Sequence, residues 1–372
     1  MLDEKILRND EKAVYNLRSI YRRFGYKRFK MSKFEEYDLY VRNKDFLISD
    51  GIITFTDTNG RLLALKPDVT LSIIKNAKDI KGTVEKLYYN ENVYRISQDS
   101  HSFKEINQTG LECIGDISLY DICEVLYLAI KSLESIDENY IIDIAHAGLV
   151  SELVQACNLS NDIKATVFES IQNKSLDEIT VLFQNEIIDK FSYDIISKLV
   201  LTYKTYKDVI SAFRGINSSV DSQLDEFTAI CKSLSELTLT EKVRIDFSIV
   251  NDTSYYSGLV FKGYISGIFT SVLSGGQYDK LMKKMGKKSC AIGFAVYLDL
   301  LERLEYDDNG FDVDSVLLYD EKSNLSALAD AVKLFSADGK SVMVQKCVPE
   351  NIKYKQLLKL NEKGVEILEN NA

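Results

Sequence analysis

Hydrophobic residues recur at helical spacing in two segments of the chain. Near the start they occupy positions 14, 17, 20, 21 and 24, which share one helical face, and Gly25 follows as a stop signal. The same period appears at Ile122, Val125, Leu126, Ala129, Ile130 and Leu133. We therefore predict amphipathic helices over 10–26 and 122–133.

Short runs of β-prone residues between and after these helices predict strands. In IITFTDTNGRLLAL, two β-rich segments flank Thr-Asn-Gly, which is a hairpin signal. KLYYNENVYRI and EINQTGLECIG are further predicted strands, and strand texture returns at KVRIDFSI, SYYSGLVFKGYI and FTSVLSGG. A helix is predicted to follow over 295–304. This order indicates an α+β fold with an antiparallel sheet.

Two blocks differ from this core, which we place at 1–305. From about 150 to 240, helical spacing repeats without proline, which predicts a helical insertion. After the turn signal Asp-Asp-Asn-Gly at 307–310, residues 311–372 show the order strand, helix, strand, helix. We predict a small, truncated α/β domain there.

Composition and charge narrow the class of protein. Hydrophobic residues make up 45% of the 372 and charged residues 27%, as in an ordinary globular protein. The net charge of -10 argues against a protein that binds nucleic acid by neutralising phosphates. No apolar run reaches the roughly 20 residues that cross a bilayer, and the first residues are too charged for a secretory signal. We expect a cytoplasmic protein without a membrane partner.

Cysteine and histidine usage excludes several kinds of site. The six cysteines are scattered without a C-x-x-C pair, and His101 and His146 are the two histidines. A site that needs several imidazoles is therefore excluded, and we expect no metal and no cofactor. His146 lies in the apolar run IIDIAHAGLV and is interpreted as a structural histidine.

The string LSGGQ at 273–277 is the signature of ABC transporter ATPases. We reject an ATPase, because the sequence contains no G-x-x-x-x-G-K-[ST] loop to hold phosphates. We interpret LSGGQ as a strand-to-helix turn whose glycines permit close backbone approach or a positive φ, with a ligand-lining role as the alternative.

The predicted strand EINQTGLECIG carries candidate binding residues. Its two-residue period places Gln108 and Glu112 on one face with Gly110 between them, and Leu111 and Cys113 on the other. An amide and a carboxylate on either side of a glycine make a slot for a ligand. An ordinary solvent-facing strand is an equal alternative.

Two other segments carry candidate chemistry. In LKPDVT, Asp68 and Thr70 suit an ammonium group, although Pro-Asp is also a common turn. Tyr255 and Tyr256 either wall a pocket or pack on a sheet. The residues by themselves predict an α+β protein with a pocket.

The order of these segments resembles the catalytic domain of the histidyl-tRNA synthetases over roughly residues 5–305. KFEEYDLY, ALKPDVTLSIIKN and VLSGGQYDKL are especially similar to the family's non-catalytic paralogue, the regulatory subunit of ATP phosphoribosyltransferase in histidine biosynthesis. The resemblance implies a class II aminoacyl-tRNA synthetase-like antiparallel sheet flanked by helices. It is carried by LKPDVT, YRISQDSHSFKEINQTGLECIG, SYYSGLVFKGY, LSGGQYDKL and AIGFAVYLDLL.

The chain departs from the synthetase pattern at positions that serve ATP. Where the family's third motif has glycine and arginine, this chain has Tyr297 and Leu300. Two family arginines correspond to Asn251 and Gln277, and a Gly-Arg pair is replaced around His101. Each charged hydrogen bond lost is worth about 1.5 to 3 kcal/mol. The resemblance therefore implies no catalytic residues and no aminoacylation.

The positions that hold the amino acid in the synthetases are mostly kept in kind. The resemblance implies that Asp68 and Thr70 take the α-ammonium group of histidine, that Glu112 and the tyrosines take the imidazole, and that Gln108 orients the ligand. The complete implied set is Asp68, Thr70, Arg95, Gln108, Glu112, Tyr255 and Tyr256.

The resemblance also implies partners. We expect a homodimer within a hetero-oligomer that contains a short-form ATP phosphoribosyltransferase catalytic subunit, which this chain activates and whose inhibition by L-histidine it helps to mediate. Residues 311–372 resemble the start of an anticodon-binding domain but are too short for a whole one, so tRNA is not expected as a partner. The alternatives are a divergent histidyl-tRNA synthetase and a stand-alone module that senses histidine or tRNA.

Overall fold

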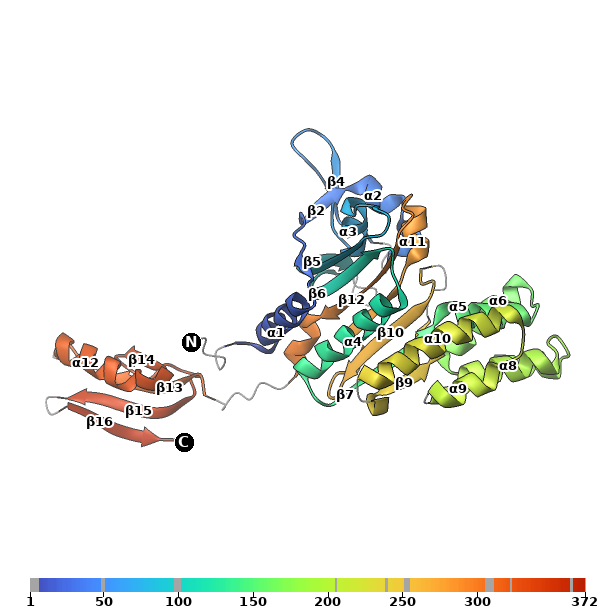
Figure 1. Cartoon of the computed structure of the whole chain (residues 1–372). Coiled ribbons are helices and arrows are strands. Elements are labelled where there is room, and N and C mark those ends of the chain that lie inside the picture. The colour runs from blue at the N-terminus through green and yellow to red at the C-terminus, as the bar shows by residue number, and fades with distance from the viewer. Residues whose placement is uncertain are drawn as a thin grey trace. The chain divides into compact units, whose positions relative to one another are not determined.

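The chain folds into two compact units, Asn9–Leu304 and a second that comprises Met1–Arg8 and Glu305–Ala372 (Figure 1). A computed structural model describes residues 7–47, 51–96, 102–204, 206–237, 240–250, 255–304, 311–321, 323–361 and 364–371. Within these ranges, no helix combines the length and the apolar character needed to cross a membrane.

A nine-stranded sheet forms the centre of the unit Asn9–Leu304. Its strands are β1 (Lys27–Arg28), β5 (Val84–Ile96), β6 (Phe103–Gly115), β7 (Tyr140–His146), β8 (Tyr203–Lys204), β9 (Val243–Asp246), β10 (Leu259–Ile265), β11 (Leu273–Gln277) and β12 (Cys290–Tyr297). They follow the order β1-β5-β6-β12-β11-β10-β7-β9-β8. β1 is parallel to β5 and β7 to β9, while the other neighbours are antiparallel, which confirms the predicted α+β class.

Two long helices cover one face of this sheet. They are α1 (Asn9–Arg23) and α4 (Leu119–Ile136), close to the predicted ranges. α1 ends before Gly25, whose φ of 82° is the left-handed conformation that favours glycine. The Tyr21 hydroxyl lies 3.0 Å from Ser132 Oγ, and this hydrogen bond joins the two helices inside the core.

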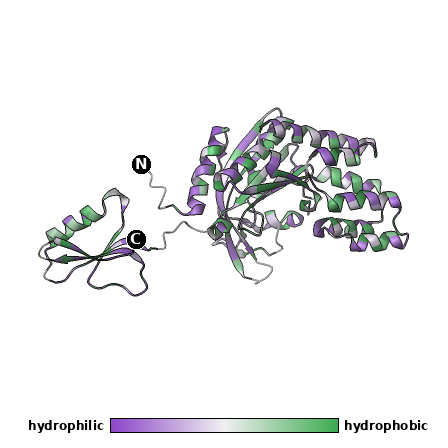
Figure 2. Cartoon of the chain, turned by 90° about the horizontal axis from the view of Figure 1, so that it is seen from below, coloured by the Kyte–Doolittle hydropathy of each residue, from purple (hydrophilic) through white to green (hydrophobic). Residues whose placement is uncertain are grey.

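A block of helices continues the core beyond β7. It contains α5 (Ala147–Ala156), α6 (Asn161–Asn173), α7 (Asp177–Gln184), α8 (Lys190–Leu201), α9 (Tyr206–Phe213) and α10 (Ser218–Leu237), followed by the 3-10 turns η3 (Thr240–Lys242) and η4 (Phe247–Ile249). Figure 2 shows purple and green alternating around these helices, whereas the central strands are mostly green. The helices are thus amphipathic, and their apolar sides join the same core as the sheet.

The opposite face of the sheet carries a second apolar cluster around Leu71, Ile73 and Tyr89. A three-stranded sheet of order β2-β4-β3 lies here, and its β3 and β4 form the predicted hairpin with Gly60 in the turn at φ 79°. The elements are β2 (Phe34–Glu36), α2 (Tyr37–Val41), η2 (Lys44–Phe46), β3 (Thr54–Thr56), β4 (Leu62–Leu65), α3 (Thr70–Asn76) and α11 (Asp279–Lys284).

The second unit has a sheet of its own. Its elements are β13 (Val313–Leu318), α12 (Leu325–Phe335), η6 (Ala337–Gly339), β14 (Val342–Gln345), β15 (Tyr354–Asn361) and β16 (Gly364–Asn370). The strand order is β14-β13-β15-β16. α12 packs on one face of this sheet through Ala331, against Leu317, Leu358 and Leu360.

Two predicted helices are wrong. The helix over 295–304 starts three residues later, as the 3-10 helix η5 (Leu298–Arg303), because the alternating residues Ile292, Phe294 and Val296 belong to a buried strand. The last helix of the chain is the antiparallel pair β15 and β16. Gly364, at φ 121°, begins β16 in a conformation that a continuous helix does not allow.

His146 is a structural residue, as predicted. It is 1% exposed, and its Nδ1 accepts a hydrogen bond of 3.1 Å from the Leu149 amide, which caps the start of α5. Its Nε2 lies 3.8 Å from Oε1 of Glu226 on α10, and the proximity of His146 lowers the pKa of Glu226. His146 thus ties β7 to two helices of the neighbouring block.

We expect H146A to lower the free energy of unfolding by about 2 kcal/mol or more, because it removes the helix cap and leaves a cavity. H146N retains an acceptor at the cap position and should lose less. Urea unfolding followed by circular dichroism measures both variants. Equal losses would show that the cap contributes nothing at this position.

Candidate functional site

A cavity of about 390 Å³ lies on the face of the large sheet opposite α1 and α4. Glycines make room for it: a Cβ at Gly293 would overlap the Glu112 carboxylate, and one at Gly276 would press on the Tyr256 ring. Gly275 also lines the cavity and lies against Phe294. Because these glycines have no side chain, neighbouring side chains can lie against the strand backbone.

Glu112 is the most deeply placed polar group of the cavity. It is 1% exposed, and its Oε1 accepts a hydrogen bond of 2.8 Å from Thr70 Oγ1. The Tyr278 hydroxyl donates to the other oxygen. Burial raises the pKa of Glu112 to about 8, against the lowering effect of these two donors. At pH 7 the neutral acid is therefore the main form.

The LKPDVT segment places a second acid beside the first. Asp68 Oδ1 accepts a hydrogen bond of 2.8 Å from the Leu71 amide at the start of α3. Burial raises the pKa of Asp68, while this hydrogen bond and the nearby Arg95 charge oppose the rise. Asp68 is thus both the turn residue and the cavity-lining residue that the sequence left as alternatives.

Contacts with β5 fix this segment in place. Arg95 Nε donates to the Pro67 carbonyl at 2.9 Å. Lys66, which is fully buried, pairs with Glu91 Oε2 at 2.6 Å. Since removing one partner of a buried ion pair is costly, the position of Asp68 and Thr70 depends on β5.

Aromatic rings form one wall of the cavity. The rings of Tyr255 and Tyr256 meet edge to face at 4.7 Å, and Tyr255 also lies 5.7 Å from Phe46 and 6.2 Å from Tyr278. Burial raises the pKa of Tyr256 above its usual range, so its hydroxyl stays protonated. An aromatic, partly polar wall of this kind suits an aromatic ring with polar edges.

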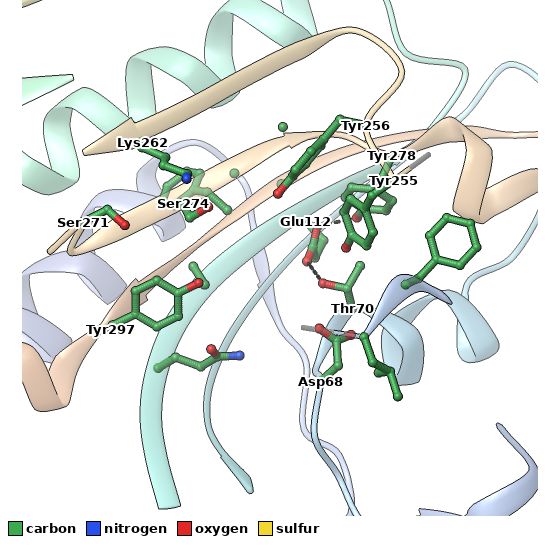
Figure 3. A pocket seen from close by; sticks show the side chains of 18 of the residues that line it. Asp68, Thr70, Glu112, Tyr255, Tyr256, Lys262, Ser271, Ser274, Tyr278 and Tyr297 are labelled. Atoms are coloured by element: carbon green, nitrogen blue, oxygen red, sulfur yellow. Dashed lines mark hydrogen bonds between the residues drawn. The ribbon is translucent and has the colours of Figure 1, made fainter. Parts of the chain in front are cut away.

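All seven predicted site residues line this one cavity, together with Lys262, Ser271, Ser274, Tyr278 and Tyr297 (Figure 3). In that view Asp68, Thr70, Tyr255 and Tyr278 lie toward one end, and Lys262, Ser271 and Tyr297 toward the other. Among the described residues, no group of three or more His, Cys, Asp or Glu could hold a metal ion.

Several lining residues were missed from the sequence, among them Tyr278 and Lys262. Tyr278 donates a hydrogen bond to Glu112 and directly follows LSGGQ. The sequence around it gives little indication that this tyrosine lines a cavity. Lys262 gives a clearer signal, because it is the single charge in the central strand LVFKGYI.

The structure describes three of the residues at which the sequence departs from the synthetase pattern. Gln277 Oε1 accepts a hydrogen bond of 2.6 Å from the Leu259 amide, Leu300 packs on the core, and Tyr297 lines the cavity. LSGGQ is wholly strand β11, and its glycines have no positive φ, so the predicted turn is wrong there. Gly275 and Gly276 instead allow neighbouring groups to approach the strand closely, and both line the cavity. Asn251 and His101 lie outside the described residues.

Comparison with known proteins agrees with this fold. The family model described as histidyl-tRNA synthetase matches residues 2–301. A structure described as an ATP phosphoribosyltransferase regulatory subunit/histidyl-tRNA synthetase from Bacillus halodurans is 23% identical, with a TM-score of 0.75 over 94% of this chain and 93% of that one. These matches define the class as histidyl-tRNA synthetase-like.

Relatives narrow the class further. The ATP phosphoribosyltransferase regulatory subunit of Clostridium kluyveri is 30% identical over 323 residues, which are 83% of this chain and 82% of that protein. The chain therefore belongs to the ATP phosphoribosyltransferase regulatory subunits of this class. A HisG:HisZ complex of ATP phosphoribosyl transferase from Thermotoga maritima also has this fold, with 22% identity and a TM-score of 0.61 over 78% of this chain and 97% of that one.

The raised pKa of Glu112 predicts a pH-dependent stability. The folded state holds the proton up to about pH 8, whereas an unfolded chain releases it near the ordinary value of 4.5. The free energy of unfolding should thus fall as pH rises through this window, by at most about 1.4 kcal/mol per pH unit. Burial also raises the pKa of Asp143, to about 6. Asp143 therefore contributes to the decline in the free energy of unfolding only at the lower pH values of this window.

The raised pKa of Asp68 contributes in the same direction, so E112Q, which mimics the neutral acid, should reduce this decline between pH 6 and 8. Urea unfolding at several pH values measures it. E105Q is the control. Hydrogen bonds from Asn92 and Tyr94 lower the pKa of the exposed Glu105, so this substitution should leave the decline between pH 6 and 8 unchanged. A wild-type slope that E112Q leaves unchanged would contradict a neutral Glu112.

Proposed function

We propose that this chain is a non-catalytic subunit that activates a short-form ATP phosphoribosyltransferase catalytic subunit and carries the binding site through which histidine inhibits the complex. The observation that supports this proposal is a cavity lined by two buried acids, Asp68 and Glu112, and by the edge-to-face pair Tyr255 and Tyr256. The HisG:HisZ complex from Thermotoga maritima supports the assembly with a catalytic subunit.

The polar groups of the cavity match the groups of histidine. Asp68, with the Thr70 hydroxyl beside it, is the acceptor for the α-ammonium group. Glu112 lies deeper and binds the imidazole, because a carboxyl with a pKa of about 8 can donate to or accept from a ring nitrogen near neutral pH. Tyr255 and Tyr256 flank the ring, and Gln108 orients the ligand.

The nucleotide side of the cavity has lost charge. Tyr297 projects into the lining at the position where the family has glycine, and Gln277 is occupied in a backbone hydrogen bond. Activation of an amino acid by ATP requires cations against the developing phosphate charge. We therefore infer that the chain does not aminoacylate tRNA.

Regulation requires two states with different affinity for histidine. We propose that the chain forms a homodimer inside a hetero-oligomer, and that the occupied cavity favours the assembly in which the catalytic subunit is inactive. The cavity lies between the large sheet and the segments 44–47 and 66–70, so a bound ligand contacts three separate parts of the chain.

The first test is turnover of ATP and phosphoribosyl pyrophosphate by the short-form catalytic subunit of the same organism. We expect activity to rise at least tenfold when this chain is added, and histidine to remove the increase. E112Q, which keeps the shape of the side chain but cannot release a proton to the imidazole, should keep activation but raise the inhibitory histidine concentration. No activation by a folded, dimeric preparation would refute the proposal.

The second test is ATP-pyrophosphate exchange with histidine, which reports amino-acid activation directly. We expect no exchange above a blank without enzyme, with a bona fide histidyl-tRNA synthetase as positive control. Exchange by the purified chain would instead identify it as a divergent synthetase.

A further inference from the structure

One wall of the cavity is a short turn rather than a strand of the sheet. Asp45, Phe46 and Leu47 line the cavity, and they belong to the 3-10 helix η2 and the residue that follows it. We call residues 44–47 the strap. The lining residues on β6, β11 and β12 are fixed by hydrogen-bonded neighbours on both sides of each strand, whereas the strap is a single turn.

The backbone hydrogen bonds of the strap are local. The amides of Phe46 and Leu47 donate to the carbonyls of Asn43 and Lys44, each at 3.0 Å. A 3-10 helix has poorer hydrogen-bond geometry than an α-helix, and a single turn gains little from cooperativity. Contacts made by side chains therefore decide where the strap lies.

Lys284, the last residue of α11, makes two such contacts. Its Nζ lies 2.6 Å from Oδ2 of Asp45 and 4.9 Å from the centroid of the Phe46 ring. The hydrogen bond and the charge of Lys284 lower the pKa of Asp45, so the carboxylate stays ionised near neutral pH. One ammonium group thus holds two successive residues of the strap.

The strap and α11 also connect to the interior of the cavity. The Phe46 ring lies 5.7 Å from that of Tyr255 in the aromatic wall. Tyr278, the residue before α11, donates a hydrogen bond to Glu112. α11 therefore links the deepest acid of the cavity at its start to the strap at its end.

The contacts of Lys284 are weak enough to open and close. Its side chain is 35% exposed and that of Asp45 is 76% exposed, and exposed ion pairs and cation-π contacts are each weak in water. In contrast, Gln108, Glu112 and Tyr278 are each 3% exposed or less, although they line the cavity. A ligand reaches these groups only past the cavity wall.

We propose that Lys284 is a latch that holds the strap closed against the cavity and thereby sets the rate at which the ligand enters and leaves. This inference rests on the proposed function, since it takes the ligand to be histidine. Lys284 is a positioning residue here, because it acts through Asp45 and Phe46. A latch that closes the cavity with and without ligand slows entry and exit alike, and it leaves the affinity nearly unchanged.

The first test needs no ligand. Hydrogen–deuterium exchange of the full chain, read by mass spectrometry on peptides that contain the strap, reports how often the turn opens. K284M removes both contacts and should speed exchange of the Phe46 and Leu47 amides about 3- to 10-fold, the range of one exposed ion pair and one cation-π contact. D45N removes the ion pair alone and should have a smaller effect. K284M/D45N should exchange no faster than K284M, because Asp45 acts through Lys284.

K283M is the matched control. Lys283 is exposed on the same helix, and its charge acts on Cys290 instead. This variant loses the same charge and should leave exchange in the strap at the wild-type rate. Thermal unfolding checks that each variant is folded, and K284Q replaces K284M where the methionine variant does not fold.

The second test is the rate of L-histidine binding, followed by stopped-flow tyrosine fluorescence, since the chain has no tryptophan and tyrosines line the cavity. K284M should raise the association and dissociation rate constants each by about 3- to 10-fold and keep Kd within about threefold of wild type. K283M should change neither rate.

The outcomes separate the latch from the function on which it rests. A wild type that does not bind histidine, with faster strap exchange in K284M, overturns the histidine site and supports the latch. Strap exchange in K284M equal to that in K283M overturns the latch. Weaker histidine binding in K284M without faster association also overturns it, because Lys284 would then support the site instead of closing it.

Discussion

The burial of the Glu112 carboxyl in the central sheet is the constraint on which the site depends. A carboxyl at 1% exposure must be neutral or surrounded by donors, and Glu112 meets the condition in both ways. Thr70, the first residue of α3, and Tyr278, the residue before α11, both donate hydrogen bonds to it. Gly293 on the neighbouring strand has no side chain that would fill its place. Three separate segments are therefore held together by one buried acid.

The segment before α3 depends on the same buried acid. Thr70 can donate to Glu112 only if residues 66–70 keep their path, and the Lys66–Glu91 pair fixes that path on β5. Arg95, also on β5, holds the Pro67 carbonyl and moderates the pKa of Asp68. The polar groups of the cavity thus form one connected structure, in which each ligand-facing group is also a structural group. A buried polar network that loses one of its hydrogen bonds is costly, so a substitution at one of these residues should also change the positions of the others.

The sequence predicted the helices and the hairpin because their signals are local. Hydrophobic period and Gly25 define α1, and Asn-Gly defines the β3–β4 turn. Both wrong helices fall where a strand has few polar residues to mark its alternation, as at 292–297, or where leucines also fit helical spacing, as in β15. The site was predictable through the resemblance for seven residues. Tyr278 was missed because its contact with Glu112 depends on the pairing of β11, β12 and β6, which no local pattern encodes. Lys262 does have a local signal, since it is the single charge in LVFKGYI.

The proposed regulatory role is supported by the kinds of charge that line the cavity. Asp68 and Glu112 line the cavity. At Gln277 and Leu300, where the resemblance implies arginines that bind ATP, the chain has uncharged residues that make a backbone hydrogen bond and pack on the core. An enzyme must bind its transition state more tightly than its substrate, and this requires charges at the reacting phosphate. A sensor needs a different property, namely that its ligand binds one of two assembly states better than the other. A ligand that contacts the sheet, the segment 66–70 and the aromatic wall together can supply that difference, since a small displacement of any of the three changes its binding energy.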